Sequence, residues 1–123
     1  MTILEAIHRV DALRHNVFTQ EEKIGWLAQV DGLVTEDLIR THEAGEGQTF
    51  RTYDAETPLE QQLLVPAPYD DLYLRWMEAM IDFHNGEYGK YNNAVDMFNT
   101  SYAAFQNYYN RTHMPKGKQF KYF

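Results

Sequence analysis

The chain of 123 residues contains no cysteine. Disulfide bonds, thiolate zinc sites and a cysteine nucleophile are therefore excluded. Proline and glycine are scarce: the chain has 4 prolines and 7 glycines. No apolar run approaches the roughly 18 residues that a membrane-spanning helix needs. The first residues carry charges every few positions and lack the apolar stretch of a signal peptide. We therefore expect a single domain over residues 1–123, made in the cytoplasm and without membrane contact.

Acidic residues are missing from the C-terminal end of the chain, and the last one is Asp96. Residues 1–110 contain 18 acidic against 7 basic side chains, a net charge of −11, whereas residues 111–123 contain four basic side chains and no acidic one. A strongly acidic body repels phosphate, so sequence-specific binding of nucleic acid is disfavoured. A basic tail with aromatic rings instead favours docking onto acidic protein, such as a neighbouring copy of the chain.

Apolar residues recur at helical spacing through most of the chain, which predicts an all-α fold, a small helical bundle. A first amphipathic helix is expected from Ile3 to about His15. A second begins at Thr19, whose spacing from Glu22 matches a capping box. This second helix should end at the two glycines of the stretch HEAGEG.

Two places in the first half of the chain depart from this regular pattern. Asp31 lies within the apolar stripe of the second helix and is followed by Gly32, which predicts a bend or a buried polar contact. Residues 43–68 are irregular and long for a loop in a compact domain, so we expect an arm that makes contacts. Within it, TFRTYDAE predicts a short strand or an extended segment. Thr57 as a cap and Pro58 at the first position then predict a short helix.

The C-terminal half is dominated by aromatic residues at heptad spacing. From Tyr69 onward we expect a helix with two apolar stripes, followed by a kink or a tight turn at HNGEYG. Beyond it a long C-terminal helix (or the second half of a kinked pair) should pack along one seam. The candidate packing or interface residues are Tyr88, Tyr91, Val95, Phe98, Tyr102, Phe105 and Tyr109 on this seam, with Tyr69, Tyr73 and Trp76 on the preceding helix.

The C-terminal helix is also poor in charge. Residues 91–110 contain six aromatic rings, five asparagines and a single charged side chain. Asparagine lowers helix stability by up to about 0.7 kcal/mol relative to alanine, so packing has to offset that cost. Rings and amides together are typical of a surface that lies against other protein, because an amide is buried at lower cost than a charge. The alternative is a helix packed only within its own monomer, with its amides in water.

The sequence shows no residue pattern typical of catalysis or metal binding, and we expect no enzyme and no cofactor. The five histidines lack the spacing of a zinc site, and the motifs for phosphate and dinucleotide binding are missing. The local cluster of Glu78, Asp82 and His84 fits a solvated helix face better than a metal site. The carboxylate pairs at 21–22 and 70–71 are expected at helix starts, where negative charge favours the helix dipole.

Three stretches of the chain resemble one family: EEKIGWLAQVDGLV, PYDDLYLRWMEAMIDFHNGEYGKYNNAVDMFN and YYNRTHMPKG. They resemble head–tail connector (adaptor) proteins of long-tailed phages and of prophages in Gram-positive bacteria, over about residues 17–117. The stretch FRTYDAETPLEQQ matches nothing in that family. The resemblance implies a mostly helical virion protein, assembled in the host cytoplasm as a ring of identical copies. Its partners would be the portal protein and the tail or stopper proteins, with DNA passing through its channel, and it implies no catalytic residues.

The basic tail fits an arm that reaches a partner during assembly. Pro115 and Gly117 should end the long helix, and residues 114–123 have too little apolar area to fold alone, so we expect a flexible tail in the free subunit. The candidate docking residues are Lys116, Lys118, Phe120, Lys121, Tyr122 and Phe123.

Two other hypotheses stay open at the level of sequence. One is a small helical regulatory or binding protein of a prophage, without catalytic activity. The other is a metal-dependent enzyme that uses Glu78, Asp82 and His84. A regulator should be a monomer or dimer, so the oligomeric state separates it from a ring-forming connector, and metal analysis tests the enzyme.

Overall fold

The computed structural model describes residues 1–41, 50 and 52–113, apart from the side chain of Arg40. These residues form four α-helices and one short 3-10 helix, and no strand occurs among them. The elements are α1 (Ile3–Leu13), α2 (Gln20–Asp37), η1 (Ile39–Thr41), α3 (Leu72–His84) and α4 (Tyr88–Thr112). The predicted all-α fold with a long C-terminal helix is confirmed. The predicted C-terminal tail lies outside the described residues.

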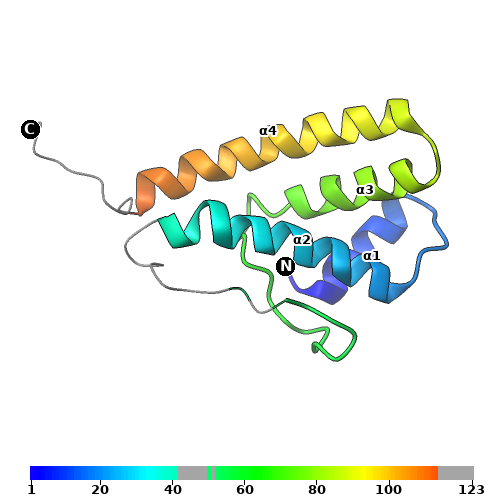
Figure 1. Ribbon diagram of the computed structural model, residues 1–123, viewed down its shortest axis with the longest axis horizontal. Coiled ribbons are helices and arrows are strands. Elements are labelled where there is room, and N and C mark those ends of the chain that lie inside the picture. Colours follow the sequence, from blue (N-terminus) through cyan, green and yellow to red (C-terminus); the bar gives the residue numbers. More distant parts are fainter. Residues whose placement is uncertain (42–49, 51, 114–123) are drawn as a thin grey trace, which may run out of the picture.

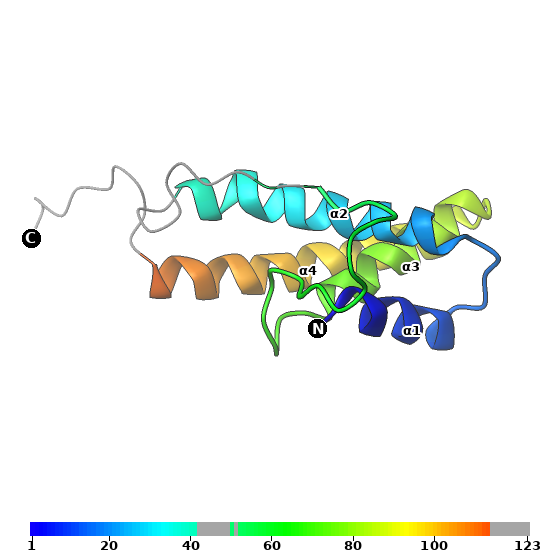
Figure 2. The ribbon, with the colours of Figure 1, turned by 90° about the horizontal axis from the view of Figure 1, so that it is seen from below.

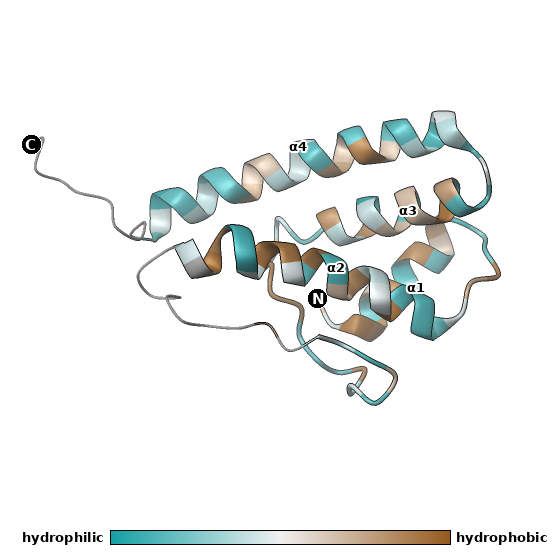
Figure 3. Ribbon diagram, viewed as in Figure 1, coloured by the Kyte–Doolittle hydropathy of each residue, from teal (hydrophilic) through white to brown (hydrophobic). Residues whose placement is uncertain are grey.

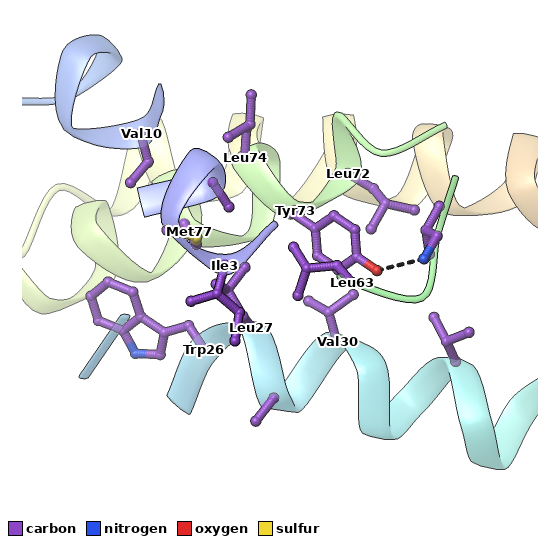
Figure 4. Close-up of a cluster of buried hydrophobic side chains, with 14 of the residues drawn as sticks. Ile3, Val10, Trp26, Leu27, Val30, Leu63, Leu72, Tyr73, Leu74 and Met77 are labelled. Carbon is purple, nitrogen blue, oxygen red and sulfur yellow. Dashed lines mark hydrogen bonds between the residues drawn. The ribbon is translucent and has the colours of Figure 1, made fainter. Parts of the chain in front are cut away.

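Helix α3 is the centre of the bundle. It packs against α1, α2 and α4, and Figure 2 shows α1 and α2 on opposite sides of it. The two apolar stripes predicted for this helix are therefore both covered, although the helix begins three residues later than Tyr69. Figure 4 shows Ile3 from α1, Leu27 from α2 and Met77 from α3 meeting in the core; all three are fully buried.

Helices α1 and α2 both begin with a capping box. In α2 the predicted box is confirmed: the Thr19 hydroxyl accepts a hydrogen bond from the Glu22 amide at 3.1 Å, and the Glu22 carboxylate accepts one from the Thr19 amide. Thr2 and Glu5 form the same arrangement in α1, at 3.1 Å in both directions. Each box satisfies amides that a helix start would otherwise leave without partners.

A tight turn joins α3 to α4, which run antiparallel as a hairpin (Figure 1). Gly86 adopts φ +77° in this turn, a conformation that side chains other than glycine rarely adopt. The amide of Glu87 donates to the Asp82 carbonyl at 2.8 Å and closes the turn. Of the two sequence alternatives at HNGEYG, a turn is therefore correct and a kink is wrong.

Residues 52–71, which we call the arm from here on, form isolated turns and bends between α1, α2 and α3 rather than the short helix predicted from Thr57 and Pro58. That prediction was wrong because the arm's backbone pairs with the start of α1. The amides of Ile3 and Leu4 donate to the carbonyls of residues 61 and 59 at 3.1 and 3.0 Å. These two amides lie in the first turn of α1 and have no partner within the helix, so the carbonyls of the arm satisfy them.

Asp31 fixes the arm to the bundle. Its buried carboxylate accepts hydrogen bonds from the hydroxyls of Tyr53 and Tyr73, both at 2.5 Å, and from the Leu64 amide at 3.1 Å. The Tyr73 hydroxyl in turn accepts a bond from the Val65 amide at 2.7 Å. The predicted buried polar contact is confirmed, whereas the predicted bend is absent because α2 is continuous through residue 32.

Burial sets the protonation behaviour of this cluster. It raises the pKa of the Asp31 carboxyl above its ordinary value, and the three hydrogen bonds offset part of that rise because they favour the ionised form. The pKa values of the Tyr53 and Tyr73 hydroxyls are raised as well, chiefly by burial and then by the neighbouring carboxylate. Both hydroxyls therefore stay protonated and keep donating to Asp31 at neutral pH.

We predict that Tyr73→Phe destabilises the chain more than Tyr53→Phe. Loss of the Tyr73 hydroxyl leaves both the Val65 amide and one Asp31 oxygen buried without a partner, at about 1–3 kcal/mol for each group. Loss of the Tyr53 hydroxyl leaves the other Asp31 oxygen still bonded to the Leu64 amide. Urea unfolding of both variants at pH 7 measures the difference, and equal losses would contradict this account of the cluster.

Candidate functional site

The inner face of α4 belongs to the core of the subunit. Its buried residues are Ala94, Phe98, Tyr102 and Phe105, spaced four, four and three residues apart. The Tyr102 hydroxyl donates to a carboxylate oxygen of Asp37 at 2.8 Å, which links α4 to the end of α2. Burial, and then this hydrogen bond, raise the pKa of Tyr102 above its ordinary value.

Aromatic contacts connect the inner face of α4 to α3 and the arm. The Trp76 and Phe98 rings have centroids 5.3 Å apart, and Phe98 stacks on Tyr102 at 5.7 Å. Further along, Tyr69 of the arm stacks on Tyr108 at 4.9 Å. Pairs at these separations add to the stability that burial alone gives. The rings of α4 thus hold the monomer together along this face.

The predicted packing seam is only partly correct. Phe98, Tyr102 and Phe105 are buried, and Tyr91, Val95, Tyr109, Tyr69 and Trp76 are half-buried. Tyr88 is 60% exposed, which corrects its assignment to the seam. Tyr88 is the first residue of α4, beside the turn that joins it to α3, and a straight helix drifts away from a strict heptad repeat. Tyr73, the remaining candidate residue, is also buried, and its hydroxyl donates a hydrogen bond to Asp31 of α2.

The outer face of α4 is exposed and nearly free of charge. We define this outer face as Asn92, Asn93, Asp96, Met97, Asn99, Thr100, Ala103, Ala104 and Asn107, which are all exposed. Asp96 is the one charged side chain in the set. Met97 is 49% exposed, and Figure 3 shows polar positions along α4 interrupted by less polar ones. An exposed helix face with a single charged side chain is a candidate interaction surface, because interface cores are depleted in charge.

An apolar patch at one end of the bundle was missed in the sequence. It consists of Leu13, Val17, Phe83 and Tyr88, which are all exposed. Figures 1 and 2 show the α1–α2 connection and the α3–α4 turn at the same end of the molecule. We call this set the end patch. No local signal could have found it, because its members come from three helices and the α1–α2 connection, which meet only in the fold.

Glu78 and Asp82 do not lie on a solvated helix face, and that interpretation was wrong. They are only 7% and 1% exposed because α1 covers this side of α3. Arg14 of α1 forms an ion pair with Asp82 at 3.0 Å, and Arg75 forms one with Glu78 at 2.7 Å. Burial raises the pKa of Asp82 above its ordinary value, and the Arg14 guanidinium opposes that rise. The cluster is a structural ion-pair network.

His84 lies apart from these two carboxylates. Its ring stacks on Trp26, with centroids 6.0 Å apart and an interplanar angle of 13°. In the ranges that the structure describes, no group of three or more His, Asp or Glu side chains is arranged to hold a metal ion. Glu78, Asp82 and His84, which the alternative hypothesis of a metal-dependent enzyme requires together, do not form such a group.

No family model, curated protein or solved structure matches the chain. None of the helices in the described part of the chain is both long and apolar enough to cross a membrane.

We predict that Phe98→Ala lowers the free energy of unfolding by about 3–5 kcal/mol, because it leaves a cavity between α3 and α4. The neighbouring Met97→Ala is the control. Since its side chain lies on the outer face, its effect should stay within about 0.5 kcal/mol. Chemical unfolding of both variants makes the comparison. A loss below about 1 kcal/mol for Phe98→Ala would mean that this ring is not part of the core.

Proposed function

We propose that this chain is a structural virion protein, a head–tail connector (adaptor) subunit of a tailed phage or prophage. In this proposal identical copies assemble as a ring under the portal protein, and the ring joins the capsid to the tail and forms part of the DNA channel. The observation that carries the proposal is the outer face of α4, which is fully formed, charge-poor and uncovered in the single subunit. The three stretches that resemble connector proteins support it.

A ring requires two different surfaces on each subunit, one for each neighbour. The outer face of α4 spans residues 92–107, about 24 Å at 1.5 Å per residue. The end patch offers an apolar surface at one end of the same hairpin, around Phe83 and Tyr88. A subunit with an elongated amide face and a separate apolar end has the asymmetry that head-to-tail contacts need.

The charge of the body fits a channel for DNA. Residues 1–110 carry a net charge of −11, from 18 acidic and 7 basic side chains. Acidic walls repel phosphate, so DNA can slide past them without being held or read. The proposed partners are therefore proteins: other copies of the chain, the portal protein and the tail or stopper proteins. The proposed location is the virion, after assembly in the host cytoplasm.

Light scattering after size-exclusion chromatography tests self-assembly. We expect the purified chain to form closed particles of many copies as its concentration rises. Ala104→Arg should abolish them, because it places an unpaired charge in the contact. Ala55→Arg is the matched control, since Ala55 is equally exposed but lies in the arm. A particle no larger than a dimer at every concentration, or equal assembly of both variants, would contradict the proposal.

The genes that flank this one test the phage part of the proposal separately. Portal and major capsid genes on the same strand would support a connector. A position among genes unrelated to virion assembly would count against it, even if the chain forms rings.

A further inference from the structure

A groove of about 280 Å³ lies where α2, the arm and α4 meet. Its walls are mostly apolar and include Val34, Ile39, Leu64, Pro66, Phe105 and Tyr108. Leu64 is 40% exposed although its neighbours Leu63 and Val65 are in the core. The volume is just below the roughly 300–1,000 Å³ of small-molecule pockets, which suits one or two side chains of a protein partner.

Aromatic rings form one wall of the groove. Phe105 and Tyr108 have ring centroids 6.3 Å apart with an interplanar angle of 29°, and Tyr108 stacks on Tyr69. Phe105 is only 2% exposed, so the half-buried Tyr108 is the ring of this wall that an incoming aromatic side chain can contact. The groove thus favours a segment that carries rings over one that carries only aliphatic side chains.

The electrostatic surroundings of the groove favour a basic segment. The C-terminal ends of α2 and α4 lie at the same end of the molecule (Figures 1 and 2), and a helix C-terminus carries partial negative charge. Glu36 and Asp37 lie in the last turn of α2, which contains no basic residue. The last turn of α4 contains one, Arg111, which offsets part of this negative charge.

We propose that this groove receives residues 114–123 of a second copy of the chain. This segment combines the required properties: it has three aromatic rings, at Phe120, Tyr122 and Phe123, and lysines at 116, 118 and 121, with no acidic side chain. A ring would enter the groove beside Tyr108, and the lysines would lie near the acidic end of α2. The inference rests on the self-assembly in the proposed function and names the contact that links neighbouring copies.

The length of the tail allows it to reach a second copy. The described part of the chain ends at His113, which lines the groove and has extended backbone, with φ −130° and ψ 143°. Seven residues separate His113 from Phe120, and seven residues can span at most about 23–25 Å. The tail therefore has the length to bring its rings to the groove of a neighbouring copy.

Disulfide trapping tests this docking in the full chain, because the natural sequence contains no cysteine. One chain carries Leu64→Cys and a second, distinguished by mass, carries Tyr122→Cys. They are mixed with oxidised glutathione as the electron acceptor, and mixed dimers are counted by mass spectrometry. The control pair uses Ala12→Cys, an exposed position on α1 outside the groove, with the same Tyr122→Cys chain.

We expect the mixed dimer to form at least about tenfold faster with Leu64→Cys than with Ala12→Cys, because docking raises the local concentration of the two thiols. High salt should reduce this advantage by screening the lysines. Equal rates for the two pairs would overturn the proposal. So would a Leu64→Cys, Tyr122→Cys double variant that closes its disulfide within one chain while mixed dimers stay at the control rate.

Disulfide trapping and light scattering test different parts of the account, so either result can be negative without the other. Disulfide trapping reports contact between two copies and does not require a closed ring. Light scattering reports the ring without regard to which segment occupies the groove. Rings without trapping would therefore overturn the tail contact alone, and trapping without rings would overturn the connector.

Discussion

The buried carboxylate of Asp31 is the constraint on which the rest of the structure depends. It joins α2 to the arm through Tyr53 and Leu64, and to α3 through Tyr73. A buried charge without partners would be strongly destabilising, so these groups have to meet whenever the chain folds. The arm consequently follows one path, although it contains no regular secondary structure of its own.

The path of the arm determines which of its side chains enter the core and which line the groove. Leu63 and Val65 point into the core, while Leu64 and Pro66 line the groove at the end of α4. Because the arm, α1 and α2 surround α3, α4 is left as the outermost helix of the bundle (Figure 1). Its inner face completes the core and its outer face remains uncovered. The core and the candidate interaction surface are therefore two sides of one helix.

Features fixed by neighbouring residues could be predicted from the sequence, and features fixed by distant ones could not. The capping box of Thr19 and Glu22 depends on a spacing of three residues and is correct. A polar contact at Asp31 was predicted because this residue interrupts an apolar stripe. Its partners were not, because they lie 22 and 42 residues away in the chain.

The two main errors have the same origin. Thr57 and Pro58 have the residue types of a helix start, but the arm's carbonyls are taken by the first amides of α1, which no local pattern reveals. Asp82 has the spacing of a solvated face, but Arg14 approaches it from another helix. Within α4, composition indicated an unusual surface but could not say which rings belong to the core and which side chains remain outside.

In the proposed connector, one face of α4 belongs to the core and the other contacts a partner. Hydroxyl-radical footprinting of its methionines, in the free subunit and in assembled particles, tests this most directly. Met97 on the outer face is 49% exposed, whereas Met77 on α3 is fully buried and serves as the internal control. The account predicts that assembly protects Met97 from oxidation and leaves the low reactivity of Met77 unchanged. Equal oxidation of Met97 in the free and assembled states would contradict it.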